Sequence, residues 1–235
     1  MNILQEYKTR LDEAYPGVFI EQFENGFSYG TDAVELASYV SFKRGAKGAE
    51  LGTGTGIIPI LICADKENKR CPEKIFAFEI QEKYAALSSS NVKRNGLEDK
   101  IEVICADIKN ASRILGEKGI FSELDFVFSN PPYMKMDSGF LNETEDKLIA
   151  RHEAAATIFD VCDAASRLLK HGGDFFVVYR PDRMCDLMCA MRESSLEPKD
   201  MVFISGRAGA DPKLVLVKAK KGAASGNKIH CKALR

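Results

Sequence analysis

The pattern of apolar and polar positions becomes regular from Gly48 onward. Short apolar runs of strand length alternate there with longer stretches in which apolar residues recur every three to four positions. We expect strands at 49–51, 75–78, 101–104, 124–128, 174–179, 201–204 and 214–217, and helices at 58–66, 81–95, 108–115, 149–169 and 183–193. This alternation predicts an α/β fold, with a mostly parallel seven-stranded sheet and helices on both faces. Ligands of such sheets bind beyond the carboxyl ends of the strands, so we expect functional residues directly after strands.

The first 30 residues follow a different pattern. Apolar spacing over residues 2–14 predicts a short amphipathic helix. Residues 18–23 and 27–29 predict a hairpin, because the Asn25-Gly26 pair between them favours a tight turn.

A further helix is expected to begin near Thr31 or Asp32, either of which can cap it, and to run through Val40. We therefore predict an N-terminal extension over residues 1–30 and a single α/β domain over 31–235.

Residues 50–56 (ELGTGTG) follow the first strand of the alternating region and precede a helix. Their glycines allow a sharp turn and a close approach of a ligand to the backbone. A dinucleotide fingerprint would need glycine where Ile57 stands, and it would bind a pyrophosphate that Glu50 repels. S-adenosylmethionine carries an ammonium group at its methionine end and no phosphate. The loop therefore predicts that cofactor.

Two more acidic residues follow the next two strands. Glu79 is suited to accept the ribose hydroxyls of an adenosine group. Asp107 is suited to bind the adenine amino group, although a helix N-cap is the better interpretation of Asp107 taken alone. Three acids at consecutive strand ends, counting Glu50, favour a nucleoside-containing cofactor.

Residues 130–133 (NPPY) follow the fourth strand. Two prolines could simply end the strand, but their position and their neighbours indicate a catalytic loop. An aromatic amine is a poor nucleophile because its lone pair is delocalised into the ring. The Asn130 side-chain oxygen and the Pro131 carbonyl can accept both of its N–H groups, and Tyr133 can stack on the base. The loop predicts methylation of an aromatic amino group, with Pro132 stiffening the backbone.

Composition adds limits on location and on metals. The chain has 235 residues, 45% of them hydrophobic, with no signal-peptide pattern and no apolar run of membrane-spanning length. A soluble, cytoplasmic protein with no membrane partner is expected. The seven cysteines form no CxxC, and the histidines have no ligand spacing, so we expect reduced core cysteines and no metal.

Charge is distributed unevenly along the chain. Residues 213–235 contain seven Lys or Arg and no acid, whereas the preceding 212 residues carry 26 basic and 34 acidic groups. Such a segment suits a polyanionic partner. It equally suits a solvated, frayed end.

Six segments together resemble a known family: 27–33 (FSYGTDA), 50–56, 130–133, 150–153 (ARHE), 179–183 (YRPDR) and 213–222 (KLVLVKAKKG). The sequence resembles Rossmann-like class I methyltransferases with an NPPY motif. It is most similar to the bacterial tRNA1(Val) adenine-N6 methyltransferases. The resemblance implies S-adenosylmethionine as cofactor and tRNA as partner, with methylation of the adenosine next to the anticodon of tRNA(Val). The oligomeric state stays open.

The resemblance also completes the expected site, adding Tyr29, Thr31 and Asp32 to the cofactor contacts. The expected cofactor-binding residues are Tyr29, Thr31, Asp32, Glu50, Gly52, Thr53, Gly54, Gly56, Glu79, Ile80, Asp107 and Asn130. The expected catalytic residues are Asn130, Pro131, Pro132 and Tyr133, and the expected RNA contacts are Tyr133, Arg151, Lys218, Lys220 and Lys221. Arg151, His152 and Glu153 lie either near the pocket or at the charged start of a helix.

Two alternatives remain. The glutamine methyltransferases of release factors share the NPPY motif but usually carry an N-terminal helical domain, for which the residues before Asp32 are too few. This favours a nucleic-acid substrate over protein glutamine. A cofactor-binding subunit without activity is disfavoured by the intact motif at 130–133.

Overall fold

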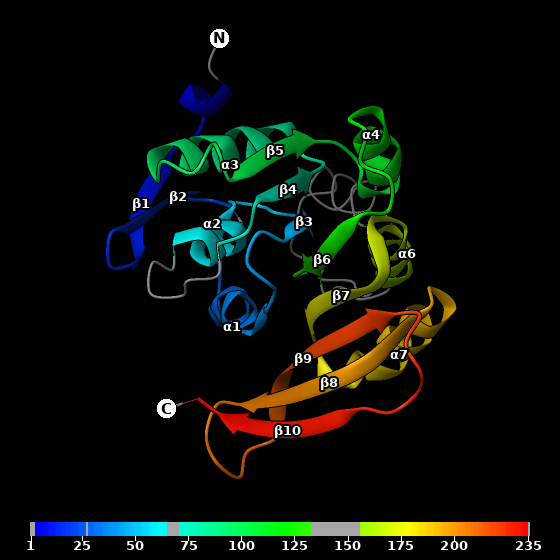
Figure 1. Ribbon diagram of the computed structural model, residues 1–235. Helices are drawn as coiled ribbons and strands as arrows, with labels where there is room; N and C mark the ends of the chain where they lie inside the picture. The colour runs from blue at the N-terminus through cyan, green and yellow to red at the C-terminus, as the bar shows by residue number, and fades with distance from the viewer. Residues whose placement is uncertain (1–2, 27, 65–70, 133–155, 235) are drawn as a thin grey trace, which may run out of the picture.

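A computed structural model describes residues 3–26, 28–64, 71–132 and 156–234. In this part of the chain an eight-stranded sheet carries the fold, and a two-stranded sheet lies beside it (Figure 1). In spatial order the large sheet consists of β10 (Lys228–Ala233), β8 (Leu196–Ser205), β9 (Pro212–Lys221), β7 (Leu169–Tyr179), β6 (Leu124–Ser129), β3 (Lys47–Leu51), β4 (Lys74–Glu79) and β5 (Ile101–Cys105). Neighbouring strands are parallel except where β9 pairs with β7 and β8.

Helices cover both faces of this sheet. They are α1 (Thr31–Tyr39), α2 (Ile57–Ala64), α3 (Glu82–Arg94), η2 (Ile108–Asn110), α4 (Ala111–Glu117), α6 (Ile158–Leu168), η3 (Pro181–Arg183) and α7 (Met184–Glu193). Alternate residues of β7 enter two separate cores: Phe175 and Val177 pack with α4, α6 and α7, whereas Phe176 packs with α1 and α2. The strand is apolar on both faces because both faces are covered. The predicted fold class is confirmed.

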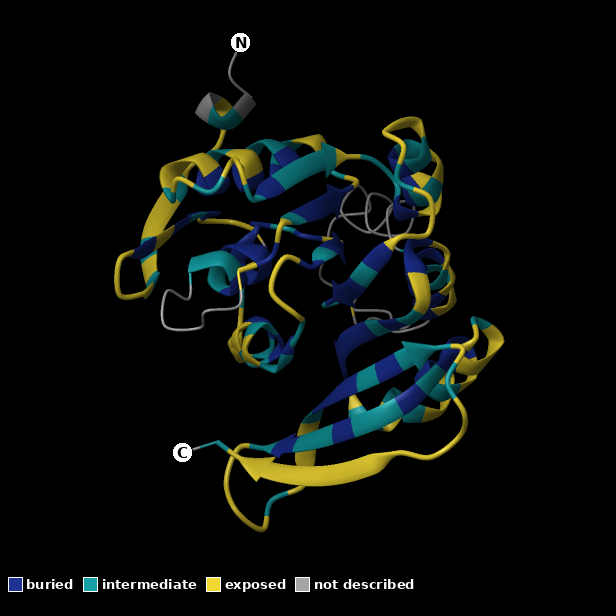
Figure 2. Cartoon of the chain, viewed as in Figure 1, coloured by how far each residue is buried: buried dark blue, intermediate teal, exposed yellow. Residues whose placement is uncertain are grey.

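The sheet has one strand more than the seven predicted. β10 pairs in parallel with β8, from Lys228 opposite Asp200 to Ala233 opposite Ser205. All six of its residues are exposed, and it forms the fully exposed edge of the sheet (Figure 2). It therefore lacks the apolar alternation that reveals a buried strand. Part of the basic C-terminal segment is β9 and β10, so a frayed end is the wrong description for these strands.

The N-terminal segment differs from its prediction. The expected helix over 2–14 is wrong: η1 (Ile3–Glu6) is followed by the strand β1 (Thr9–Tyr15), which pairs antiparallel with β2 (Val18–Phe23). The turn between them uses Pro16 and Gly17, whose φ of 78° favours glycine. The expected pairing of 18–23 with 27–29 is therefore also wrong. Apolar residues four apart, such as Leu11 and Tyr15, fit a strand as well as a helix.

The β1–β2 hairpin is bound to the main domain through Asn91 of α3. The buried Asn91 side chain accepts from the backbone N–H of Glu21 at 2.8 Å and donates to the Glu21 carbonyl at 2.9 Å. The same amide nitrogen donates to the carbonyl of Thr55, also at 2.9 Å. One side chain therefore connects the hairpin, α3 and the loop after β3.

Two helix starts differ in detail from the predictions. The N-cap of α1 is Gly30, with no side-chain cap hydrogen bond, so Thr31 and Asp32 already lie inside the helix. The start of α6 is a capping box in which Thr157 and Asp160 exchange hydrogen bonds; the expected start at 149 lies outside the described residues. None of the described helices has the length and apolar content that a membrane crossing requires.

The cysteines are free, as expected, but mostly not core residues. Cys162 is buried and Cys63 is half-buried, whereas the other five are exposed. The expectation of core cysteines is wrong for those five.

Candidate functional site

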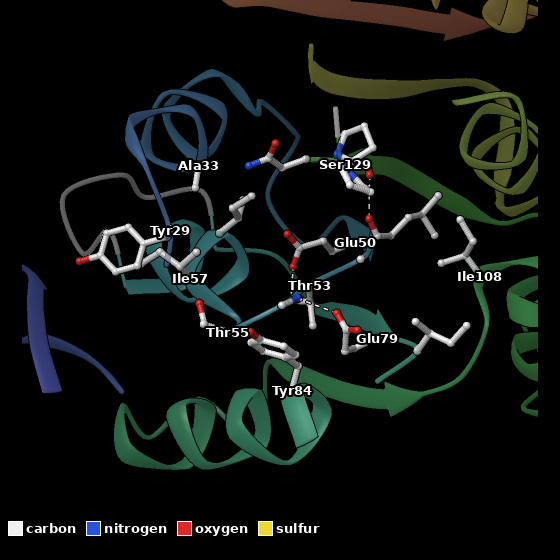
Figure 3. A pocket seen from close by; sticks show the side chains of 18 of the residues that line it. Tyr29, Ala33, Glu50, Thr53, Thr55, Ile57, Glu79, Tyr84, Ile108 and Ser129 are labelled. Carbon is white, nitrogen blue, oxygen red and sulfur yellow. Dashed lines mark hydrogen bonds between the residues drawn. The ribbon is translucent and has the colours of Figure 1, made fainter. Parts of the chain in front are cut away.

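A cavity of about 430 Å³ lies at the carboxyl ends of β3, β4, β5 and β6 (Figure 3). Residues 28–30, 32–33, 50–55, 57–58, 79–81, 84, 107–108, 129–132, 156 and 161 line it. The loops that follow consecutive strands meet at this edge because the strands are parallel. The structure thus brings most of the predicted site residues into one cavity.

The glycines after β3 do two different things. Gly52 and Gly54 have φ angles of 81° and 55°, and, apart from each glycine and its two chain neighbours, no described residue has a heavy atom within 4 Å of the place where a Cβ would stand. Their backbone is therefore open to a ligand. Gly56 is not among the residues that line the cavity, and its cofactor contact stays a prediction; a Cβ there would lie 2.5 Å from the Ser88 Oγ of α3. Its missing side chain serves helix packing.

Glu50 is the penultimate residue of β3 and is fully buried. Its Oε2 accepts a hydrogen bond from the Thr53 hydroxyl, whereas its Oε1 has no hydrogen-bond partner within the described residues. Burial raises the pKa of Glu50 to about 8; the Thr53 hydrogen bond lowers it and the charge of Glu79 raises it further. A buried carboxylate oxygen without a partner costs free energy. A bound ammonium group would provide the missing donor, so the site fits the methionine end of S-adenosylmethionine.

Glu79 at the end of β4 faces the same cavity (Figure 3). Its Oε2 accepts from the Gly54 N–H at 2.9 Å, and its Oε1 accepts from the Gln81 N–H at 3.0 Å. Burial raises the pKa of Glu79, and these backbone hydrogen bonds oppose the rise. A hydrogen bond from the Ile80 backbone also lowers the pKa, and a carboxylate with about four acceptor sites keeps capacity for a ligand hydroxyl.

Asp107 combines the two roles that its sequence position allowed. Its side chain caps η2 by accepting from the Lys109 N–H at 2.9 Å, and it also lines the cavity. The cap is confirmed, and the adenine contact stays a prediction.

Asn130 lies directly after β6, the strand that pairs with β3. The buried Ser129 hydroxyl donates to the Leu51 carbonyl at 2.7 Å, which fixes the ends of β6 and β3 together. The Asn130 Nδ2 donates to Asp32 Oδ2 at 3.1 Å. Pro131 is buried and Pro132 exposed, and both line the cavity. Tyr133, Arg151, His152 and Glu153 lie outside the described residues.

The three residues implied by the family resemblance are placed differently from one another. Tyr29 and Asp32 line the cavity, as does Ile80, whereas Thr31 does not. Thr31 borders a second hollow together with Glu35 and the end of β10.

The lysines expected to contact RNA lie away from the cavity. Lys218 and Lys220 form ion pairs with Asp174 at 3.1 and 2.6 Å. Lys220 stands opposite Asp174 at the middle of β7 and Lys218 opposite Phe176, whereas Ser129, which lines the cavity, stands opposite Val177. Because β9 runs antiparallel to β7, its later residues lie toward the amino-terminal ends of the parallel strands, away from the carboxyl ends where the cavity lies.

Lys221 likewise has intramolecular acceptors. Its ammonium group donates to the carbonyls of Ser166 at 2.6 Å and Leu169 at 2.8 Å, and burial lowers its pKa. The placement of all three lysines gives no support to the predicted phosphate contacts.

The cavity also contains residues that sequence reasoning missed. Gln81 and Tyr84 follow Glu79 closely, so their position after a strand was a usable signal. Ala156 and Val161 come from the region of α6, far along the chain, and no local motif marks them. Within the described residues, no group of three His, Cys, Asp or Glu side chains is placed to hold a metal ion.

This sheet, with a glycine loop after β3, an acid ending β4 and an Asn-Pro-Pro after β6, has the Rossmann-like fold of the class I methyltransferases. Comparison with known proteins agrees. The chain is 28% identical over 188 residues to the tRNA1(Val) (adenine(37)-N6)-methyltransferase of Bacteroides fragilis strain YCH46, covering 80% of this chain and 75% of that protein. It is 24% identical to the protein of the same name from Shewanella amazonensis, covering 89% and 84%. The predicted resemblance is confirmed.

Solved structures share the fold. A predicted O-methyltransferase, Atu636 from Agrobacterium tumefaciens, matches with a TM-score of 0.68 at 22% identity, covering 87% of each chain. M. jannaschii TYW2 in complex with AdoMet matches with a TM-score of 0.60 at 13% identity, covering 91% of this chain and 86% of that chain. No family model matches the chain.

Proposed function

We propose that this methyltransferase transfers a methyl group from S-adenosylmethionine to the N6 amine of an adenosine in tRNA. One observation carries the proposal: a single cavity holds the unpartnered oxygen of buried Glu50 on one wall and Asn130-Pro131 on another. The first fits the cofactor's ammonium group, and the second fits an aromatic amine. The names of the relatives support tRNA1(Val) as the substrate, with the adenosine next to the anticodon as the target.

The cofactor-binding residues at successive strand ends each bind a different part of the cofactor. Glu50 binds the ammonium group, Glu79 the ribose hydroxyls and Asp107 the adenine amino group. The backbone of Gly52 and Gly54 approaches the ligand without a Cβ in the way. When bound, the cofactor supplies a methyl group on an electrophilic sulfonium.

Asn130 and Pro131 activate the target amine. The Asn130 side-chain oxygen and the Pro131 carbonyl accept its two N–H groups and draw the nitrogen toward tetrahedral geometry. The lone pair is then directed at the methyl carbon instead of the ring. No strong base is needed, because the amine loses its proton to solvent as positive charge develops on nitrogen. Holding nitrogen, methyl and sulfur in line provides most of the acceleration.

The substrate contacts of Tyr133 and Arg151 remain part of the proposal. Tyr133 stacks on the target base, which is displaced from its neighbours to enter the cavity. The division into an extension (1–30) and a catalytic domain (31–235) is likewise proposed. It is supported by the separate two-stranded sheet that β1 and β2 form.

The substrate class is tested by supplying the enzyme with radiolabelled S-adenosylmethionine and either total tRNA or total protein. The proposal predicts label in tRNA, recovered as N6-methyladenosine after digestion to nucleosides. Label in protein, recovered as methylglutamine, would establish the glutamine alternative and reject tRNA. An Asn130→Ala variant in parallel shows whether the label depends on this site.

A further inference from the structure

The Asp32 carboxylate lies between two N–H donors. Its Oδ2 accepts from Asn130 Nδ2 at 3.1 Å, and its Oδ1 accepts from the Ala33 backbone N–H at 2.9 Å. An ionised carboxylate offers acceptors on both oxygens, whereas an amide offers one acceptor and one donor group. Both donors can therefore be satisfied by aspartate but not by its isosteric amide.

This arrangement decides which way the Asn130 amide points. A carboxylate only accepts, so the Asn130 nitrogen must face Asp32 and its oxygen must point elsewhere. That oxygen is the group the proposed reaction needs. If the amide were reversed, Asn130 would present N–H donors to an amine that itself needs acceptors.

Asp32 is held on a firmly packed element. Ala33 and Leu36 of α1 are buried against α2 and the sheet. Gly30 leaves room for the carboxylate, because a Cβ at position 30 would lie 2.8 Å from Asp32 Oδ1. The φ of Gly30 is −118°, which any residue adopts, so the space and not the backbone requires glycine there.

We propose that Asp32 is a positioning residue that fixes the amide of Asn130 with its oxygen toward the target amine. The expected effect on catalysis rests on the proposed function, whereas the hydrogen bond between Asp32 and Asn130 is present in the structure whatever the reaction. It departs from the family resemblance, which implies that Asp32 contacts the cofactor.

The test exchanges the two side chains. Asp32→Asn can keep its oxygen on Ala33 N–H only by turning its NH₂ toward Asn130, which reverses the Asn130 amide. Asn130→Asp places two carboxylates against each other. In the double variant Asp32→Asn/Asn130→Asp, the new amide donates to the new carboxylate, and the second oxygen of that carboxylate again faces the target amine. The double variant therefore restores the arrangement that each single variant loses, with a donor facing an acceptor between positions 32 and 130 and an oxygen facing the target amine.

Turnover on tRNA and calorimetric affinity for S-adenosylmethionine are measured for each variant. Each single substitution is expected to lower kcat by about tenfold or more, the usual effect of losing a hydrogen bond to a charged group. The exchange is expected to recover about tenfold over Asn130→Asp, with cofactor affinity within about threefold throughout. Gly30→Ala is expected to lower kcat in the same direction, because it displaces the carboxylate. The matched control is Glu35→Gln, which removes a charge from the same helix and is expected to leave kcat unchanged.

Three outcomes would overturn the proposal: an Asp32→Asn enzyme within about threefold of wild-type kcat, no recovery in the exchange, or a cofactor affinity that falls in step with kcat. The last would make Asp32 a cofactor ligand. A wild-type enzyme without activity on tRNA would instead reject the proposed function. In that case the side-chain amide resonances of Asn130 decide the positioning role, since they should shift in Asp32→Asn and not in Glu35→Gln; unchanged resonances would reject it.

Discussion

At the residue scale, the most informative group is the carboxylate of Glu50. It is fully buried, and one of its oxygens has no partner in the described residues. Without a ligand, an apolar residue or a paired polar residue at this position would make the folded protein more stable. The cost is understandable if a bound cation supplies the missing partner, which is the reason a binding site can retain a group that folding alone disfavours.

The titration of Glu50 gives a pH-dependent prediction. In the folded protein, burial raises the pKa of Glu50 from 4.5 to about 8, so its carboxyl group stays protonated up to that pH. The unfolded chain binds fewer protons between these values, so this group makes the free energy of unfolding fall as pH rises through that window. We expect Glu50→Gln to remove this part of the pH dependence in the cofactor-free protein. Thermal unfolding of both proteins from pH 5 to 9 measures it, and identical pH profiles would contradict the assignment.

Glu79 tests the cofactor pose. Glu79→Ala removes the acceptor proposed for both ribose hydroxyls, and each hydrogen bond to a charged group contributes about 1.5–3 kcal/mol. Calorimetry is expected to show cofactor binding weakened by at least that amount. Unchanged affinity would remove Glu79 from the ribose site.

At the element scale, the sequence predicted best the strands buried on both faces. β3, β4 and β6 are short apolar runs because helices cover them on each side, and their loops carry local motifs. β10 could not be found in this way, because all its residues are exposed. β1 was misassigned because its half-exposed pattern also fits a helix. The Asp32–Asn130 contact joins residues 98 positions apart, so only the tertiary structure reveals it.

The close approach of α2 to α3 depends on Gly56. Gly56→Ala places a Cβ 2.5 Å from Ser88 Oγ and demands a φ of 81° from an L-residue, so we expect destabilisation by about 1–3 kcal/mol. Chemical denaturation measures it. Ser88→Ala should be tolerated, since the buried Ser88 hydroxyl has no partner in the described residues. It should also relieve part of the loss in the double variant, and full additivity would argue against this contact.

At the scale of the whole molecule, two further basic residues are placed to meet RNA, besides the lysines whose RNA contacts stay a prediction. Lys218, Lys220 and Lys221 of β9 have acceptors within the protein. Arg207 and Lys213 lie instead near the turn from β8 to β9, at the same edge of the sheet as the cavity. Both are exposed, and neither has an acceptor among the described residues.

Substitution of this pair tests where tRNA is bound. Arg207→Ala/Lys213→Ala is expected to weaken tRNA binding and to make its salt dependence shallower by about one to two counterions. The matched control is Lys43→Ala/Arg44→Ala, which removes the same two residue types from an exposed turn before β3, at the opposite edge. Equal effects of the two pairs would mean that binding follows net charge and not this edge.

We propose that this cavity methylates the N6 amine of an adenosine in tRNA through Asn130. Mass spectrometry of tRNA treated with wild-type enzyme or with Asn130→Ala, after digestion to nucleosides, tests this. We expect N6-methyladenosine with the wild type and none with Asn130→Ala, and we expect calorimetry to show that the variant still binds S-adenosylmethionine. Methylation at another atom, or an Asn130→Ala enzyme within about threefold of wild-type turnover, would contradict it.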